Sequence, residues 1–131
     1  KPVIIHSREA AADTMYIMKN YAQGLGGVIH CYSYSREMAE EYVKMGFYIG
    51  IGGVVTFKNA KKLKDVAAAI PIEKIVLETD CPYMAPEPYR GKRNQSSYIR
   101  YVAEKIAELK AMSQEEVIAV TEKNARDLYG I

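Results

Sequence analysis

The sequence has little of several residues that mark common classes of protein. Its 131 residues contain no tryptophan, two histidines and two cysteines. Cys31 and Cys81 lie far apart and form neither a disulfide framework nor a C-x-x-C motif, which favours a reducing compartment, the cytoplasm; we interpret both as packing residues. No apolar run approaches the roughly 20 residues that cross a bilayer, so we expect no membrane partner. The formal net charge is only +2, and composition alone therefore does not indicate a nucleic-acid-binding protein.

Short β-rich runs alternate with amphipathic stretches along the whole chain. The patterns predict strands at residues 3–5, 27–29, 47–51 and 74–78. They predict helices over about 9–23, from an N-cap at Ser35 to Gly46, over 63–70, over about 99–106, and from Ser113, which forms a capping box with Glu116. Strands that alternate with helices indicate βαβ units and a parallel sheet. No repeat or linker interrupts the chain, so we expect residues 1–131 to form a single unit.

The strand ends carry the residues with the most chemical information. Both histidines, His6 and His30, directly follow a β-run, and the fourth run ends in Glu78-Thr79-Asp80. Parallel strands present their carboxyl ends on one face, where the active site of a (β/α)₈ barrel forms. Imidazoles and a carboxylate are ligands for zinc and similar divalent cations, which activate water and polarise phosphoryl or carbonyl groups. The pattern therefore predicts a hydrolytic metal site at His6, His30 and Asp80.

Other interpretations of these residues remain open. Each histidine can cap its strand through backbone hydrogen bonds, and Asp80 can N-cap a following turn, but equivalent positions on three strands favour a shared site. Glu78 shares a face with Asp80 because strand side chains alternate with a period of two. It is either an outer carboxylate that orients a metal-binding residue or a salt-bridged residue of the barrel.

A basic loop follows the fourth strand. Residues 86–94 bring together Tyr89, Arg90, Lys92 and Arg93. The cations would neutralise substrate phosphates and the tyrosine would stack on a base, so we predict these four as substrate-binding residues. The alternative is a solvated basic loop without a ligand.

Five segments, in this order, resemble motifs of the TatD family of metal-dependent deoxyribonucleases, and together they cover the length of the chain. They are residues 2–8 (PVIIHSR), 30–33 (HCYS), 78–83 (ETDCPY), 89–94 (YRGKRN) and 124–130 (NARDLYG). The resemblance implies an α/β fold: a parallel (β/α) half-barrel that forms the C-terminal four βα units of a TIM-type (β/α)₈ metal-dependent hydrolase, with closing C-terminal helices.

The resemblance also implies a reaction and a set of cofactors. His6 and His30 would hold one of two divalent metal ions (zinc, magnesium or manganese), and Asp80 would serve the other metal and the nucleophilic water. The implied activity is hydrolysis of DNA phosphodiesters, by trimming of ends, in the cytoplasm. The runner-up is a related barrel metallohydrolase that acts on a lactone, an amide or a phosphate monoester.

The chain also departs from the family pattern. It continues the basic loop with Asn94-Gln95-Ser96 where members of the family have Asn-Glu-Pro, and it lacks the family's His-x-His pair and bridging glutamate. Because a strand pattern begins almost at Lys1, we expect an upstream half that supplies these ligands. Four parallel strands also leave two unpaired edges. We therefore expect that a missing N-terminal half covers these edges or that the chain self-associates through them. In either case we expect little activity from these residues alone. A third alternative for the function is a non-catalytic half-barrel assembly module.

Overall fold

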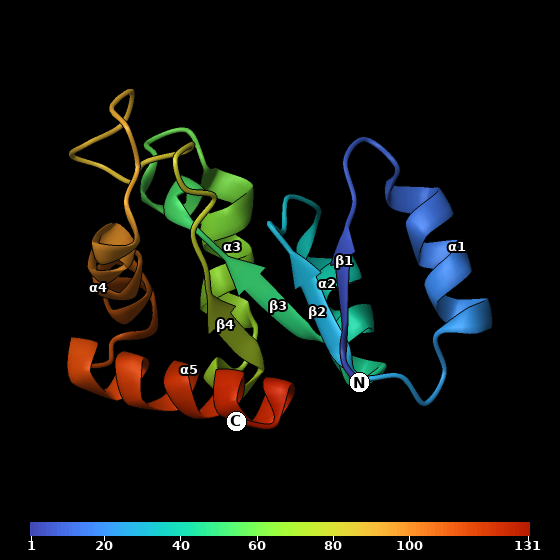
Figure 1. The fold of residues 1–131 in the computed structure, drawn as a ribbon. Helices are drawn as coiled ribbons and strands as arrows, with labels where there is room; N and C mark the ends of the chain where they lie inside the picture. Colours follow the sequence, from blue (N-terminus) through green and yellow to red (C-terminus); the bar gives the residue numbers. More distant parts are fainter.

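A computed structural model describes all residues, 1–131, and shows a four-stranded parallel sheet (Figure 1). The strands, in spatial order, are β1 (Val3–His6), β2 (Gly27–His30), β3 (Tyr48–Ile51) and β4 (Ile75–Leu77). The α-helices are α1 (Ala11–Tyr21), α2 (Arg36–Lys44), α3 (Lys61–Ala69), α4 (Ile99–Lys110) and α5 (Gln114–Tyr129). Short 3₁₀-helices are η1 (Gly53–Thr56), η2 (Ile72–Lys74) and η3 (Ser96–Tyr98). The predicted parallel (β/α) half-barrel with closing helices is confirmed.

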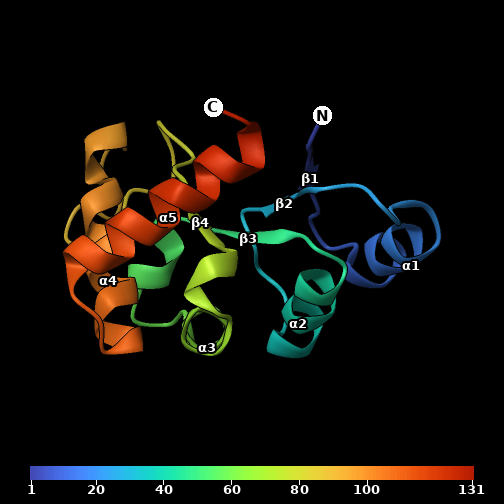
Figure 2. The same ribbon diagram turned by 90° about the horizontal axis from the view of Figure 1, so that it is seen from below.

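The two faces of the sheet pack against different partners. Strand alternation places Ile29, Ile49 and Ile75 on one face, where they join the main core with apolar residues of α2, α3 and α4. On the other face, which we call the inner face, Val28 and Val76 pack against Leu128 of α5. Figure 2 shows α2 and α3 on one side of the sheet and α5 across the other. The apolar residues of the inner face therefore lie near α5, and the polar residues that follow them lie at the carboxyl ends.

Local sequence explains where three of the α-helices begin, α1, α2 and α5. Ser35 caps α2 by accepting a hydrogen bond from the Met38 N–H, and Ser113 with Glu116 forms the predicted capping box of α5. Helix α1 begins at Ala11, later than expected, because Glu9 has a left-handed φ of 53° that no helix continues.

Strand β4 is shorter than the pattern predicts. Lys74 belongs to η2, and Glu78 lies just beyond the end of the strand. The Glu78 N–H still donates to the carbonyl oxygen of Ile51 at 3.1 Å, so this residue keeps its place beside β3.

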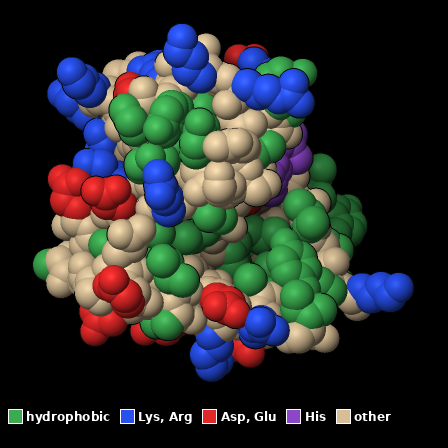
Figure 3. Space-filling view, turned by 60° about the vertical axis from the view of Figure 1, so that its left-hand side comes forward, with side chains coloured by type: hydrophobic (Ala, Val, Ile, Leu, Met, Phe, Trp, Pro, Cys, Tyr) green, Lys and Arg blue, Asp and Glu red, His purple; other side chains and the backbone are tan.

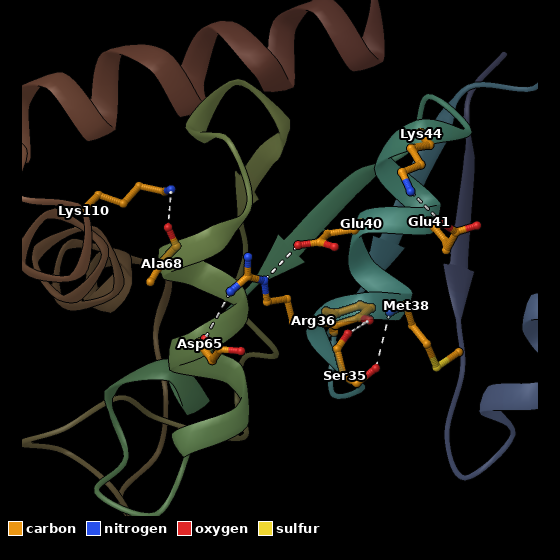
Figure 4. A network of polar contacts seen from close by, with 10 residues as sticks. Ser35, Arg36, Met38, Glu40, Glu41, Lys44, Asp65, Ala68 and Lys110 are labelled. Carbon is orange, nitrogen blue, oxygen red and sulfur yellow. Dashed lines mark hydrogen bonds and ion pairs between the residues drawn. The ribbon is translucent and has the colours of Figure 1, made fainter.

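Polar contacts connect the outer helices to one another. Arg36 donates from Nε to Glu40 at 2.8 Å within α2, and its Nη1 lies 4.0 Å from Oδ1 of Asp65 in α3 (Figure 4). Lys110 of α4 donates to the carbonyl oxygens of Ala68 and Ile70 at the end of α3. Exposed ion pairs of this kind contribute little free energy, so these contacts mainly fix the orientation of the helices.

Helix α5 is anchored below the strands by one buried side chain. Nδ2 of Asn124 donates to the carbonyl oxygens of Ile72 and Ile75, both at 2.8 Å. This contact joins α5 to the start of β4, and α5 lies away from the arrowheads that mark the carboxyl ends of β1 and β2 (Figure 1).

The sheet has two open edges. β1 pairs only with β2, and β4 pairs only with β3. On β1 the side chain of Ile4 is 61% exposed, although it lies on the inner face beside Val28. What covers these edges stays a prediction. None of the helices combines the length and apolar character needed to cross a membrane.

Candidate functional site

The carboxyl ends of the strands bring the three predicted metal ligands together. His6 and His30 are partners in the β1–β2 register, and their ring centroids are 5.6 Å apart. The Nε2 atom of His30 lies 3.3 Å from Oδ1 of Asp80, which follows β4. His6 and Asp80 both line a cavity of about 610 Å³ at this end of the sheet. His30 does not line this cavity, but it lies next to both lining residues through its ring contact with His6 and its approach to Asp80.

Glu78 contacts the other side of the His30 ring. Its Oε2 accepts a hydrogen bond from Nδ1 of His30 at 2.8 Å, and its Oε1 accepts one from the Cys31 N–H at 2.5 Å. Burial raises the pKa of the Glu78 carboxyl, and the hydrogen bond from His30 opposes that rise. An ionised carboxylate only accepts hydrogen bonds, so Nδ1 of His30 donates to Glu78, and Nε2 on the other side of the ring faces Asp80. Both interpretations of Glu78 include this contact, because it orients the His30 ring and is also an ion pair when His30 is charged.

The geometry of His30 and Asp80 fits two ligands of one cation. Ligand atoms about 2.0–2.1 Å from a tetrahedral metal are about 3.3–3.4 Å apart, and the distance from Nε2 to Oδ1 is 3.3 Å. A proton on Nε2 or a cation bound between the two atoms stabilises this approach. No three histidine, cysteine, aspartate or glutamate side chains form a complete metal-binding group in this chain. The residues present therefore fit part of a divalent metal site.

Cys31 differs from its interpretation as a packing residue. Strand alternation would direct its side chain away from that of His30, but Cys31 has a left-handed φ of 50° that ends the alternation. Its thiol consequently donates to Oδ2 of Asp80 at 3.1 Å. Burial, and then the hydrogen bond to Asp80, raise the pKa of the Cys31 thiol to about 12, so it stays a protonated donor at neutral pH. The packing interpretation is also wrong for Cys81, which is exposed.

The cavity includes cations that sequence reasoning did not single out for this role. Arg8 follows β1 and Lys62 lies in the first turn of α3, and both line the cavity together with Asn59. Neither cation forms an ion pair with an acidic side chain. The run Lys58-Asn59-Ala60-Lys61-Lys62 could have predicted this position. It follows the glycine-rich end of β3, and the carboxyl ends of the other parallel strands lie on the same side.

The basic loop lies beside the cavity and does not line it. The Arg90 guanidinium lies over the Phe57 ring, 3.9 Å from its centroid, while Lys92 and Arg93 are exposed. Tyr89 stacks on Tyr98 with ring centroids 4.3 Å apart and an interplanar angle of 5°, so one of its faces is occupied. Figure 3 shows lysine and arginine side chains along the upper edge of the molecule, with histidine visible just below it. Of the four predicted substrate-binding residues, Tyr89 and Arg90 therefore contact aromatic rings of the protein. Lys92 and Arg93 are exposed cations.

Asn94 holds the end of this loop. Its N–H donates to the Pro82 carbonyl oxygen at 2.9 Å, and its Nδ2 donates to the Tyr83 carbonyl oxygen at 2.8 Å. Asn94 is buried, so the loop returns to the segment that carries Asp80. The replacement of the family's Asn-Glu-Pro by Asn94-Gln95-Ser96 therefore leaves the anchoring asparagine in place.

Histidines and carboxylates at the carboxyl ends of parallel strands are the arrangement of (β/α)-barrel metallohydrolases. The family model described as TatD related DNase matches residues 1–130 of this chain. The chain belongs to that family, as its motifs predict.

Individual relatives agree with this assignment. The chain is 51% identical over 131 residues to the uncharacterized metal-dependent hydrolase YabD of Bacillus subtilis, covering 99% of this chain and 51% of the relative. It is 46% identical over 132 residues to the uncharacterized metal-dependent hydrolase YcfH of Escherichia coli K12, covering 100% of this chain and 50% of the relative. The crystal structure of YjjV, a TatD homologue from the same organism, superposes with a TM-score of 0.90 at 31% identity, over 99% of this chain and 50% of YjjV. The chain spans about half the length of the relatives it matches.

Proposed function

We propose that the protein is a divalent-metal-dependent hydrolase of the TatD deoxyribonuclease type, acting on DNA phosphodiesters in the cytoplasm. The observation that carries the proposal is the chain of contacts from Glu78 through His30 to Asp80. A carboxylate that orients a histidine, whose free nitrogen faces a second carboxylate, is how hydrolytic metal sites are built. The family and the names of its relatives as metal-dependent hydrolases support the same class.

Each residue of the site has a role in this proposal. His6, His30 and Asp80 would hold divalent metal, two ions in the intact protein, and Glu78 orients His30. When bound, a divalent cation polarises a phosphoryl oxygen and acidifies water. Asp80 is the proposed catalytic residue because its carboxylate, 3.3 Å from His30, can accept a proton from attacking water. The Cys31 thiol, which donates to the other oxygen of Asp80, fixes the carboxylate in this orientation.

The surroundings of the site favour a polyanionic substrate. Arg8 and Lys62 line the cavity, and Arg90, Lys92 and Arg93 extend the positive charge along the neighbouring loop. Cations that form no ion pair with the protein can bind phosphates of a nucleic-acid strand. Tyr89 keeps one face away from Tyr98, on which a base can stack. A small lactone, amide or phosphate monoester would use few of these cations, so DNA is the better substrate.

A direct assay separates these substrates. The natural full-length protein is freed of metal, supplied with Mn²⁺, Mg²⁺ or Zn²⁺, and given single-stranded DNA, small lactones and amides, or phosphate monoesters. We expect metal-dependent cleavage of DNA and no comparable turnover of the small substrates, with chelator abolishing the activity. Turnover of the small substrates alone would disprove the nuclease proposal and leave the hydrolase class intact.

The open edges of the sheet support a proposal about partners. β1 and β4 each have an unpaired side, and the exposed Ile4 extends the inner face past the area that α5 covers. We propose that further strands of the same barrel, carried by an N-terminal half, cover this face, or that a second copy does so when they are missing. The chain by itself then lacks part of the metal site and has little or no activity. A non-catalytic assembly module would show the same association but no activity in any form of the protein.

A further inference from the structure

Gly50 lies on the inner face of β3. This strand runs between β2, which ends in His30, and β4, which Glu78 follows. The β2–β3 register pairs Ile29 with Ile49, so the next residues, His30 and Gly50, are neighbours. The β3–β4 register pairs Gly50 with Val76, two residues before Glu78. His30 and Glu78 therefore come from strands on opposite sides of β3, with backbones roughly 9.5 Å apart, and their side chains meet above Gly50.

The Glu78 carboxylate occupies the space where a side chain at position 50 would lie. A Cβ atom added to Gly50 would be 2.4 Å from Oε2, 2.8 Å from Cδ and 3.0 Å from Oε1 of Glu78. These are the carboxylate atoms that accept hydrogen bonds from His30 Nδ1 and the Cys31 N–H. The glutamate could not keep both contacts beside even one additional methyl group.

The backbone does not require glycine at this position. The glycines with a left-handed φ are Gly24, Gly46, Gly91 and Gly130, and Gly50 is not among them. Any L-residue can adopt its extended conformation, and alanine would even reduce the entropy of the unfolded chain. The space that the glutamate occupies is therefore what distinguishes glycine from alanine here.

Other buried glycines of the chain meet different atoms. A Cβ on Gly27 would be 2.1 Å from the backbone oxygen of Val3, and one on Gly53 would be 2.4 Å from that of Met84. Those contacts involve main chain that cannot easily move, so these glycines serve packing of the fold. At Gly50 the obstructing atoms are the far end of one flexible side chain, which can rotate away at the cost of its hydrogen bonds.

We infer that Gly50 is a positioning residue of the metal site, which acts by leaving room for Glu78 to reach across β3 and orient His30. This inference rests on the proposed function, because it takes His30 as a metal ligand through Nε2. An alanine at position 50 displaces the carboxylate and leaves the Nδ1–H of His30 without its acceptor. The ring is then free to rotate. The fold survives, but the geometry of Nε2 and Asp80 is lost.

A double-mutant cycle in the natural full-length protein tests this role. The variants are Gly50→Ala, Glu78→Ala, the double variant, and Gly26→Ala as a matched control, because a Cβ at Gly26 has no atom within 4 Å. Titration with Mn²⁺ measures metal affinity, ¹⁵N NMR of the metal-free protein reports which nitrogen of His30 carries the proton, and thermal unfolding reports the fold. Only His6 and His30 contribute imidazole signals from this chain.

We expect Gly50→Ala and Glu78→Ala each to weaken Mn²⁺ binding about 10–100-fold, the usual loss when a partner of a metal ligand is removed. The double variant should bind no more weakly than Glu78→Ala, since nothing then remains for the new methyl group to displace. His30 should lose its Nδ1–H signal in Gly50→Ala and keep it in Gly26→Ala. Losses that add in the double variant, or an unchanged His30 signal in Gly50→Ala, would overturn the inference. If the unmodified protein binds no Mn²⁺ while Gly50→Ala still alters the His30 signal, the proposed function fails and the positioning by Gly50 stands.

Discussion

The guanidinium of Arg90 lies over the ring of Phe57, with 3.9 Å between Cζ and the ring centroid. Such a cation–π contact holds the guanidinium beside the ring, and its N–H donors can still bind a phosphate. It also joins the basic loop to the segment between η1 and α3, which leads to Lys62 and the cavity. The stacked pair therefore connects the two groups of cations that we assign to the DNA strand.

The cations of the loop should determine the salt dependence of DNA binding. Lys92→Ala or Arg93→Ala should weaken binding to all sequences equally and reduce the slope of log affinity against log salt by about 1 for each phosphate that is no longer neutralised. Arg90→Lys keeps the charge but removes the planar stack, so it should weaken binding with a smaller change in slope. Fluorescence anisotropy of labelled single-stranded DNA at several salt concentrations measures both. Lys44→Ala, at an exposed lysine of α2, serves as control, and slopes unchanged in every loop variant would refute this binding path.

The approach of His30 to Asp80 leads to a prediction about metal affinity and hydrolysis. Asp80→Asn retains the size of the side chain but removes the charge that faces Nε2. In the full-length protein it should reduce Mn²⁺ affinity by more than the roughly 10–100-fold expected from loss of an outer partner, and it should abolish hydrolysis. Asp65→Asn is the matched control, because Asp65 is an exposed aspartate of α3. Equal metal binding by Asp80→Asn and its parent would remove Asp80 from the proposed ligands.

The sequence allowed the residues at the strand ends to be predicted because their pattern is local. An apolar run followed by histidine locates a strand end, and parallel strands share one face, so the meeting of His6, His30 and Asp80 needs no knowledge of distances. The direction of the Cys31 side chain could not be predicted in this way. It depends on one left-handed residue, and nothing in a cysteine side chain signals that conformation.

The function of Gly50 and the place of Arg90 were equally out of reach. A glycine near the end of a strand predicts a close approach, but not that the approaching atoms belong to a glutamate just after the next strand. The Arg90–Phe57 contact joins residues 33 positions apart in sequence (90 − 57) through loops that carry no periodic pattern. Packing between distant segments decides such contacts, whereas periodicity reports only which face a residue occupies.

The buried amide of Asn124 predicts a large effect on stability. Its Nδ2 donates to the carbonyl oxygens of both Ile72 and Ile75. Its loss removes one hydrogen bond from each oxygen, while the Ile72 oxygen keeps the bond from the Ile75 N–H. Asn124→Ala should therefore lower the free energy of unfolding by about 1–3 kcal/mol, the usual cost of one buried polar group that loses its partner. Chemical denaturation followed by circular dichroism measures the change. Lys123→Ala removes an exposed ion pair with Asp127 on the same helix and should leave the midpoint of denaturation unchanged. An equally small effect of Asn124→Ala would show that α5 is held by its apolar contacts instead.

The free side of β1 predicts how the 131-residue chain behaves in isolation. β1 offers unpaired backbone donors and acceptors, and Ile4, at 61% exposure, adds an apolar side chain on the inner face of the same strand. An open edge of this kind pairs with any available strand, so the chain should self-associate, with light scattering showing dimers or larger species at increasing concentration. Ile4→Lys should reduce this association because a charge on the edge strand opposes pairing, while circular dichroism stays unchanged. Ile118→Lys, at another exposed isoleucine on α5, should associate like the parent. A well-folded parent chain that stays monomeric at all accessible concentrations would mean that its edges need no partner.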